Sequence, residues 1–172
     1  VDVRNTAAAL LAAHDKLRTA RLLHRSFVPH PSTAHLRPGD RPEIAAPAVL
    51  KPRFGSWGRD VVLCLDDGAV DAYLASIRGR PWFARHGLLI QEVLPAVGHD
   101  LRVLVAGGRV VGAIERRAAP GEWRTNISVG GSAVPAEVTP EAAELAATAA
   151  AVAGLDLVGV DLLPVGPGSW VV

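Results

Sequence analysis

The spacing of apolar residues along the chain predicts three helices. Apolar side chains fall on one side of a helix that follows Asp15 and runs to about Arg25. Asp15 is placed to cap this helix by accepting hydrogen bonds from its free N–H groups, and Lys16 by itself is interpreted as a solvated helix residue. The same spacing predicts a helix over residues 67–77. A third is predicted over residues 139–153, because a threonine cap, a first-turn proline and a first-turn acid open it and a glycine follows it.

Short apolar runs bounded by turn residues predict strands. The runs lie at residues 48–50, 61–65, 88–94, 101–106, 109–117 and 157–163, with a final strand at the end of the chain. The pair Gly107-Gly108 is a hairpin turn signal, and further turns are expected at Gly130-Gly131 and at residues 166–168. The chain therefore combines hairpin-connected strands with a few helices.

Three stretches are expected to lack regular structure. Two prolines end the first helix and force extended backbone within residues 27–33. Several prolines and mixed charges make residues 35–47 an irregular connector within the fold rather than a linker between domains. The loop predicted over residues 78–87 carries Trp82 and Phe83, which we interpret as packing side chains rather than as a platform for a ligand.

The composition narrows the classes of protein to which the chain can belong. The 172 residues are enough for one domain with two lobes. Lys and Arg number 18 against 17 Asp and Glu, and this net charge of +1 argues against nucleic acid or a membrane surface as a partner. Glu144, Asp156 and Asp161 interrupt the apolar C-terminal part before it reaches the roughly 20 residues that a membrane span needs.

Cysteine usage and the first residues indicate a compartment. Cys64 is the single cysteine and is expected to pack as a small buried residue, so a disulfide framework is excluded. Residues 1–4 do not begin the basic, apolar and small-residue succession of a signal peptide. Both observations fit a cytoplasmic protein.

The stretch over residues 49–61 has the composition of a phosphate-handling loop. An apolar run delivers Lys51, a loop with Gly55 and Gly58 follows, and a second apolar run returns. Glycines let backbone N–H groups approach an anion, and the lysine supplies a compact positive charge. No Gly-Lys-Ser/Thr closes the loop, so it is not a nucleotide P-loop. A glycine-containing hairpin with a surface lysine explains the same residues and stays open at this point.

Charged residues gather on the strands in the middle of the chain. Alternation places Asp100, Arg102 and Leu104 on one face of a strand if that strand begins at Asp100. Nearby in sequence are Glu115, Arg116, Arg117, Glu122, Arg124 and Asn126. Such residues form either ordinary ion pairs on an exposed sheet or the lining of a cleft.

One carboxylate, Asp161, stands within the apolar run over residues 157–163. A lone ionised carboxylate is costly to bury, so a buried Asp161 should be paired with a base, hydrogen-bonded or bound to a metal. An aspartate that faces water at the end of a strand, or one with an arginine partner, explains the same pattern.

In their order along the chain these motifs resemble those of the ATP-grasp ligases, in the branch with the ribosomal-protein glutamate ligases and the α-aminoadipate ligase of lysine biosynthesis. The motifs are Asp15-Lys16, Val49-Leu50-Lys51-Pro52, Gly55-Ser56-Trp57-Gly58-Arg59, Leu89-Ile90-Gln91-Glu92-Val93, Asp100-Leu101-Arg102, Ala113-Ile114-Glu115-Arg116-Arg117, Arg124-Thr125-Asn126, Gly130-Gly131 and Gly159-Val160-Asp161-Leu162. The glycine loop is most similar to the lysine-biosynthesis members. The resemblance covers nearly the whole chain and implies an α+β ATP-grasp fold, with two α+β lobes and the nucleotide between them.

The resemblance also implies roles for the matching residues. Lys16 and Lys51 would contact the nucleotide phosphates, and residues 55–61 would fold over them as a lid. Asp100 would bind the ribose hydroxyls. Asp161 would be a ligand to Mg²⁺, which would answer the question of its burial.

Arg116 and Asn126 are the expected catalytic residues, facing the γ-phosphate and the acyl group, and residues 91–94 would be a hinge that meets the adenine through its backbone and Glu92. The expected cofactor-binding residues are Lys16, Lys51, Gly55, Ser56, Trp57, Gly58, Arg59, Gln91, Glu92, Val93, Leu94, Asp100, Arg102, Arg116 and Asn126.

The implied reaction is ATP-dependent ligation of a carboxylate to an amine through an acyl phosphate, with ATP and Mg²⁺ (or Mn²⁺) as cofactors. The partners would be an amino-acid donor and a carboxylate on a peptide, protein or carrier protein, and a homo-oligomer is left open. An acceptor that is a small molecule or cofactor is the second hypothesis. A non-catalytic nucleotide-binding scaffold is the third.

The resemblance divides the chain into three parts. Residues 1–14 would be the remnant of a preceding domain and linker, residues 15–94 the small lobe with the lid, and residues 95–172 the large lobe. A Glu-x-Asn pair that completes the magnesium site in the family is expected to follow Val172. The absence of methionine also suggests a piece of a longer protein.

Overall fold

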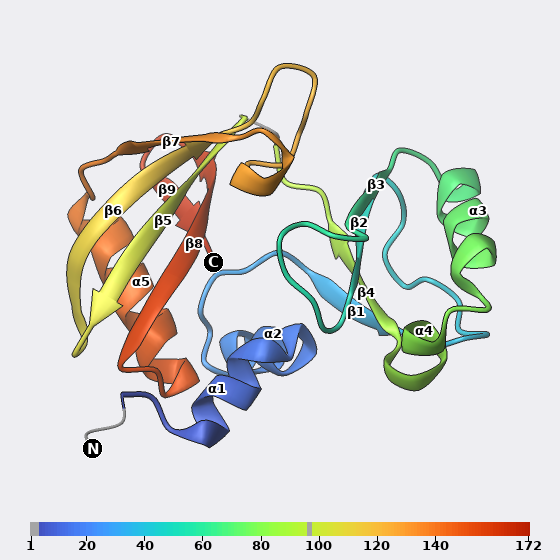
Figure 1. The fold of residues 1–172 in the computed structure, drawn as a ribbon, viewed down its shortest axis with the longest axis horizontal. Coiled ribbons are helices and arrows are strands. Elements are labelled where there is room, and N and C mark those ends of the chain that lie inside the picture. Colours follow the sequence, from blue (N-terminus) through green and yellow to red (C-terminus); the bar gives the residue numbers. More distant parts are fainter. Residues whose placement is uncertain (1–3, 96–97) are drawn as a thin grey trace.

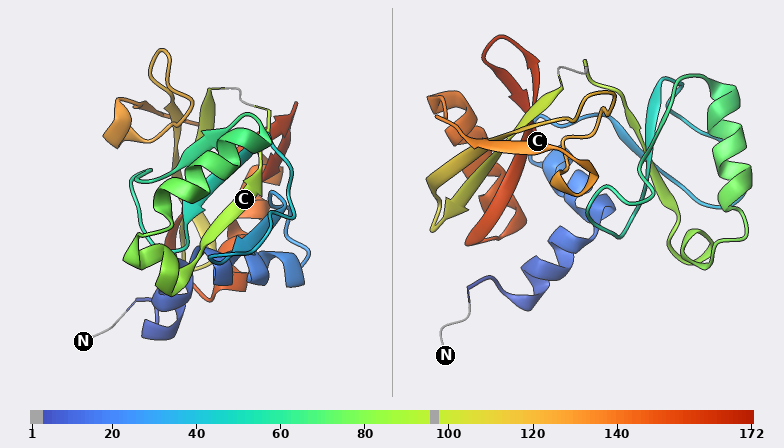
Figure 2. Two further views of the ribbon diagram at one scale, coloured as in Figure 1. Left: turned by 90° about the vertical axis from the view of Figure 1, so that its right-hand side faces the viewer. Right: turned by 45° about the horizontal axis from the view of Figure 1, so that its top comes forward.

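The computed structural model describes residues 4–95 and 98–172. The expectation about the first residues of the chain falls in part on residues 1–3, which lie outside the described residues. Two β-sheets lie side by side and form two lobes, with the first two helices between them at one end (Figures 1 and 2).

The small lobe is built on a four-stranded antiparallel sheet. Its strands are β1 (Thr33–Leu36), β2 (Ala48–Pro52), β3 (Val62–Cys64) and β4 (Leu88–Glu92), in the order β1-β4-β2-β3. Helix α3 (Asp67–Ile77) lies on the side of this sheet that faces away from the large lobe, and α4 (Pro81–His86) lies at its end (Figure 1). Leu50, Val70, Phe83 and Ile90 are buried in its core.

The large lobe is a five-stranded antiparallel sheet covered on one face by α5 (Pro140–Ala153). Its strands are β5 (His99–Ala106), β6 (Arg109–Arg117), β7 (Ser132–Pro135), β8 (Leu157–Gly166) and β9 (Ser169–Val171), in the order β7-β6-β5-β8-β9. Alternation along β5 buries Leu101, Val103 and Val105 against α5. The other face of this sheet has no α-helix among the described residues and carries the polar side chains. A short 3-10 helix, η1 (Ile127–Val129), lies in the loop between β6 and β7 on the cavity side.

Helix α2 (Lys16–Arg25) joins the two lobes, and α1 (Ala7–His14) precedes it. Asp15 caps α2 as expected, with its Oδ1 accepting from the N–H of Leu17 at 3.1 Å and of Arg18 at 3.3 Å. Leu23 of α2 is buried in the core of the large lobe. The backbone N–H of Lys16 donates to the carbonyl of Arg53 in the small lobe at 3.2 Å.

Most expected elements are confirmed. The helices at 16–25, 67–77 and 140–153 and the strand at 109–117 have the predicted extents. Strand β5 begins at His99, early enough to include Asp100. Phe83 is 3 % exposed inside the small-lobe core, and Trp82 packs against that core, so both are packing side chains.

Two predictions of irregular structure were wrong. The stretch 78–87 contains α4, a six-residue helix that is too short to show a periodic apolar pattern. The stretch 35–47 begins inside β1, whose pairing with β4 rests on a partner more than 50 residues away in sequence. No helix among the described residues is both long and apolar enough to cross a membrane.

Candidate functional site

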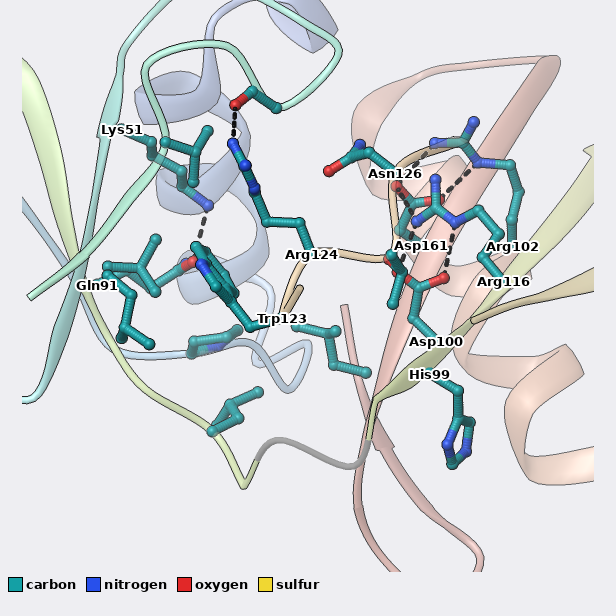
Figure 3. A pocket seen from close by; sticks show the side chains of 18 of the residues that line it. Lys51, Gln91, His99, Asp100, Arg102, Arg116, Trp123, Arg124, Asn126 and Asp161 are labelled. Atoms are coloured by element: carbon teal, nitrogen blue, oxygen red, sulfur yellow. Dashed lines mark hydrogen bonds and ion pairs between the residues drawn. The ribbon is translucent and has the colours of Figure 1, made fainter. Parts of the chain in front are cut away.

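A cavity of about 1100 Å³ lies between the two lobes and is lined by both of them (Figure 3). Of the predicted site residues, Gly55 and Arg59 do not line it. Those that do are Lys16, Lys51, Ser56, Trp57, Gly58, Gln91, Glu92, Val93, Leu94, Asp100, Arg102, Arg116, Asn126 and Asp161. Residues far apart in sequence are thus brought to one space.

Two lysines supply positive charge on the small-lobe side of this cavity. The Nζ of Lys51 donates to the Oε1 of Gln91 on the neighbouring strand β4 at 2.7 Å. The Nζ of Lys16 donates to the carbonyl of Gly55 at 2.6 Å. Burial lowers the pKa of both lysines. The pKa of Lys51 falls to about 8, with the charge of Lys16 as a second cause. An anion bound beside these lysines would favour their charged forms.

The end of β4 and the residues that follow it line the cavity. Glu92 forms two hydrogen bonds with Ser32, just before β1. Its Oε1 accepts from the N–H of Ser32 at 2.7 Å, and its own N–H donates to the Ser32 carbonyl at 3.0 Å. Val93 and Leu94 line the cavity beyond the end of the strand. The predicted contact of this hinge with adenine stays a prediction.

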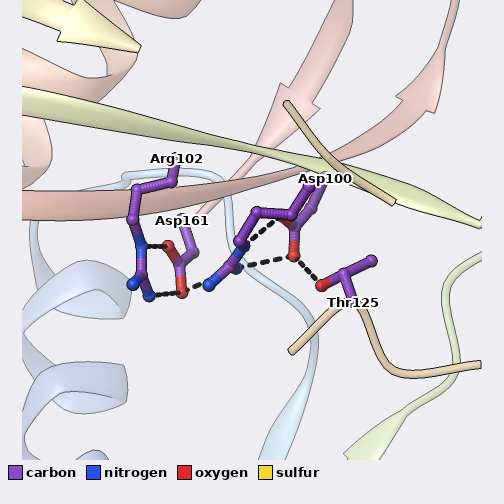
Figure 4. Close-up of polar contacts among 5 residues, drawn as sticks. Asp100, Arg102, Thr125 and Asp161 are labelled. Carbon is purple, nitrogen blue, oxygen red and sulfur yellow. Dashed lines mark hydrogen bonds and ion pairs between the residues drawn. The ribbon is translucent and has the colours of Figure 1, made fainter. Parts of the chain in front are cut away.

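On the large-lobe side, two aspartates and two arginines form a network across three strands (Figure 4). Arg102 donates to both carboxylate oxygens of Asp161 at 2.7 and 2.8 Å. Arg116 donates to both oxygens of Asp100 at 2.7 Å each, and it also contacts Asp161 at 3.0 Å. Thr125 donates to Asp100 as well.

Sheet register creates this network. Arg102 lies opposite Asp161 on β8, and Asp100 lies opposite Arg116 on β6. Burial opposes the charge on Arg116, but its bonds to Asp100 and its proximity to Asp161 outweigh that cost and raise its pKa. Asp100 and Arg116 are each about 5 % exposed, so this pair is buried.

Of the alternatives that the sequence left open for Asp161, the structure shows the aspartate with arginine partners, Arg102 and Arg116. Only its neighbours Val160 and Leu162 reach the core, because side chains alternate along β8. The side chain of Asp161 is 43 % exposed and faces the cavity. Its predicted role as a ligand to Mg²⁺ does not depend on burial.

A magnesium ion in proteins is commonly held by one or two carboxylates together with phosphate oxygens. Asp161 lines the cavity with a carboxylate that is 43 % exposed, so it can serve in such a site once its arginine partners release its oxygens. The described residues contain no group of three or more His, Cys, Asp or Glu side chains that could hold a metal without a phosphate.

The sequence prediction missed Trp123, Ile127 and Ser128, which line the cavity in the loop over residues 122–128. Arg124 and Thr125 line it too, and the motif with Asn126 had included them without giving either a role. Figure 3 shows Arg124 reaching from the large lobe to the glycine loop of the small lobe. The available signal was a Trp-Arg-Thr-Asn succession, which does not reveal which lobe each side chain contacts.

Two sheet-based lobes with charged side chains around the cavity between them are the architecture of the ATP-grasp fold, and solved structures with that fold superimpose on this chain. A D-alanine–D-alanine ligase from Bacillus anthracis solved with ATP superimposes with a TM-score of 0.70 at 16 % identity, covering 95 % of this chain and 54 % of that one. The ATP-grasp ligase PsnB, solved with the precursor peptide PsnA2 and AMPPNP, gives 0.69 at 19 % identity, covering 98 % and 50 %. These similarities establish the fold, as the sequence had predicted.

Within that class, residues 13–172 match the RimK-like ATP-grasp domain, and the chain belongs to that family. Among curated relatives, proteins named "Probable alpha-L-glutamate ligase" are 37 % identical in Pseudomonas paraeruginosa and 40 % identical in Thioalkalivibrio sulfidiphilus. Each alignment covers 166 residues, which are 92 % of this chain and 54 % of the relative. The chain therefore spans about half the length of these relatives. The resemblance that the motifs indicated is confirmed at the level of the family.

Proposed function

We propose that this chain is the nucleotide-binding core of an ATP-dependent carboxylate–amine ligase. The observation that carries the proposal is the distribution of charge around the cavity. Lys16 and Lys51 lie on one side, and Arg102 and Arg116 with Asp161 lie on the other. Cations on two sides of a polar cavity can hold a polyphosphate and stabilise the negative charge that develops during phosphoryl transfer.

The proposed reaction has two steps. An acceptor carboxylate oxygen attacks the γ-phosphorus of ATP, and the bond to the bridging oxygen breaks, which gives an acyl phosphate and ADP. The amine of the donor amino acid then attacks the acyl carbon, forms the amide, loses a proton and releases phosphate. No side-chain nucleophile is needed, so positioning and electrostatic stabilisation carry the catalysis.

In this proposal each side of the cavity has a distinct task. Lys16 and Lys51 hold the phosphates from the small lobe, and residues 55–61 close over them. Arg116 and Asn126 face the γ-phosphate and the acyl group, with Arg116 fixed in place by its two bonds to Asp100. The resemblance to the family adds two further roles: Arg102 would contact the nucleotide, and Asp100 would bind the ribose hydroxyls. The division into a small lobe of residues 15–94 and a large lobe of residues 95–172 stays a proposal, with α2 at the boundary, because its Leu23 is buried in the core of the large lobe.

Asp161 would hold Mg²⁺ together with phosphate oxygens, and the ion when bound would neutralise phosphate charge. In the described arrangement Arg102 and Arg116 occupy that carboxylate. Arg102 would turn from Asp161 to phosphate oxygens when nucleotide enters, because guanidinium groups bind carboxylate and phosphate with the same geometry. Arg116 would stay on Asp100 and contact phosphate from there.

For the acceptor we propose a carboxylate on a peptide, protein or carrier protein, and for the donor an amino acid. The names of the curated relatives support a glutamate ligase, and the peptide in the PsnB complex supports a polypeptide acceptor. A small-molecule acceptor is the second candidate, supported by the similarity to D-cycloserine synthetase DcsG, with a TM-score of 0.72 at 23 % identity over 94 % of this chain and 61 % of that one.

The test is a calorimetric titration of the full natural protein with AMPPNP, with and without Mg²⁺. The expected result is magnesium-dependent binding that Asp161→Asn weakens, while Glu115→Gln, an acid paired with Arg117 on the same sheet, leaves it unchanged. A folded protein that binds no nucleotide in either condition would replace the ligase with the scaffold hypothesis.

A further inference from the structure

Two loops from different lobes meet at the cavity. We call residues 55–61 the lid loop and residues 122–128 the seat loop. The Nη1 of Arg124 donates to the carbonyl of Gly58 at 3.0 Å, and the Oγ of Ser128 donates to the carbonyl of Trp57 at 2.9 Å. A Cβ on Gly58 would lie 2.9 Å from the Oδ1 of Asn126, so the lid backbone rests directly on that side chain.

Glu122 holds the seat loop in the conformation that these contacts need. Its carboxylate accepts from the Nε of Arg124 at 3.0 Å and from Nη2 at 2.7 Å, and also from the backbone N–H groups of Trp123 and Arg124. The hydrogen bond with Arg124 and those with the backbone lower the pKa of Glu122 to about 2, so it is ionised at working pH. The one remaining terminal nitrogen of Arg124, Nη1, points at the lid loop.

The lid loop has a backbone conformation that it would not keep unaided. Trp57 and Asp60 have φ values of 62° and 56°, in the left-handed region that non-glycine residues rarely adopt. Such a conformation persists when the surroundings fix it. The carbonyl of Trp57 is held by Ser128 and that of Asp60 by Tyr73 at 3.2 Å. The large lobe therefore supplies part of what shapes the lid.

We propose that Glu122, Arg124 and Ser128 are positioning residues that seat the lid loop on the large lobe and couple lid closure to the placement of Asn126. When the lid loop is seated, the backbone of Gly58 packs against Asn126. Asn126 is the side chain expected at the γ-phosphate, so the lid closes over the phosphates and fixes Asn126 in the same movement. The use of that event in catalysis depends on the proposed function. The seat itself is a property of the nucleotide-free protein.

The first test measures hydrogen exchange of the lid-loop amides in the full-length, nucleotide-free protein. Ser128→Ala removes one bond to the lid loop and should accelerate exchange there by roughly fivefold. The matched control is Ser132→Ala, an exposed serine at the start of β7 with no bond to the lid loop. Equal exchange in the two variants, whether fast or slow, overturns the seat.

A second test removes the support of Arg124. Glu122→Gln should increase the rate of trypsin cleavage after the exposed Arg59 in the lid loop. Glu115→Gln should not, because Glu115 pairs with Arg117 on its own strand and no hydrogen bond joins it to either loop among the described residues. Cleavage at the unaltered rate in Glu122→Gln would contradict the proposal. Neither experiment contains nucleotide, so each can fail while AMPPNP binding still succeeds.

The third test addresses coupling to Asn126. Gly58 and Gly121 both have left-handed backbones, with φ values of 67° and 78°, but a Cβ meets another residue only at Gly58. In the assay of ATP consumption, Gly58→Ala should raise KM for ATP and lower kcat together, at least tenfold in kcat/KM, and Gly121→Ala should change neither. A Gly58→Ala enzyme with altered KM and unaltered kcat would show that the lid and Asn126 are not coupled.

Discussion

Asp100 and Arg116 of the large sheet stabilise each other's charge in place of solvent. Asp100 and Arg116 are both buried and bond through two parallel contacts. A buried pair of this kind gains little over an apolar pair, but removal of one partner leaves an uncompensated charge. The pair therefore constrains the site more strongly than it stabilises the fold.

Arg116→Met is expected to lower the free energy of unfolding by about 3–5 kcal/mol, because Asp100 would remain buried without its partner. Arg117→Met removes an exposed pair with Glu115 on the same strand and should cost about 1 kcal/mol or less. Urea unfolding of both variants measures the difference. Equal losses would mean that Asp100 finds water or another donor.

Lys51, on the small-lobe side of the cavity, should make nucleotide binding depend on pH. Lys51 has a pKa of about 8, so it is partly neutral at pH 8. A bound phosphate favours its charged form. At pH 8 binding should therefore take up about half a proton at this residue. Below about pH 7 the uptake should vanish since Lys51 is already charged, and above pH 8 affinity should fall.

Calorimetric titration of AMPPNP at pH 8 in two buffers of different ionisation enthalpy measures this uptake. Lys51→Met should abolish it. Uptake that persists in Lys51→Met would assign the proton to another group.

The strands position the side chains of the site through their register, and the loop between β6 and β7 positions Asn126 by packing closely against itself. The loop between β6 and β7 turns at Gly131, where a Cβ would lie 2.6 Å from the carbonyl oxygen of Thr125 and 2.9 Å from that of Asn126. Both obstacles are backbone atoms, which cannot move aside without moving the loop. A glycine is thus required here by close approach.

Gly131→Ala is expected to destabilise the protein by about 1–3 kcal/mol and to weaken AMPPNP binding, because the loop that carries Asn126 must shift. Gly112→Ala is the matched control, since Gly112 lies on β6 with nothing within 4 Å of an added Cβ. Thermal unfolding and titration of both variants test this. An unaffected Gly131→Ala would show that the loop is more compliant than its contacts indicate.

At the scale of the whole molecule, the two lobes have separate cores and share few polar contacts besides the lid. Helix α2 packs in the large lobe through Leu23, yet its cap Asp15 bonds to Arg53 of the small lobe at 2.8 and 2.5 Å. This pair links the lobes at one end of the cavity. The lid and its seat link them above the cavity.

Asp15→Ala should therefore lower stability by about 2 kcal/mol and alter the distance between the lobes in small-angle X-ray scattering. Asp66→Ala, which removes the cap of α3 within the small lobe, should cost about 1 kcal/mol and leave that distance unchanged. Identical scattering for the two variants would contradict a linking role.

The same carboxylate gives this link a pH dependence. Hydrogen bonding to Arg53 lowers the pKa of Asp15 below its usual 3.8, so its contribution is fully present above that value and is lost as pH falls through the lowered one. Asp15→Ala should have no such acid-dependent component in its unfolding free energy.

Much of the fold could be predicted because its signals are local. The caps Asp15 and Thr139 and the apolar spacing within each helix define α2 and α5 within a few residues, and Gly107-Gly108 marks the hairpin between β5 and β6. The motifs also identified the family, since each keeps its order along the chain. Local hydrogen bonding and periodicity need no partner from a distant part of the chain.

The tertiary structure alone decided the partners of these residues. It pairs Asp161 with Arg102 from 59 positions away, seats Gly58 on a loop 66 positions away, and makes β1 an edge strand by pairing it with β4. Such contacts depend on sheet register and on how loops from two lobes meet. A one-residue change of register would turn every side chain of a strand to the other face, and the sequence of that strand would still look the same.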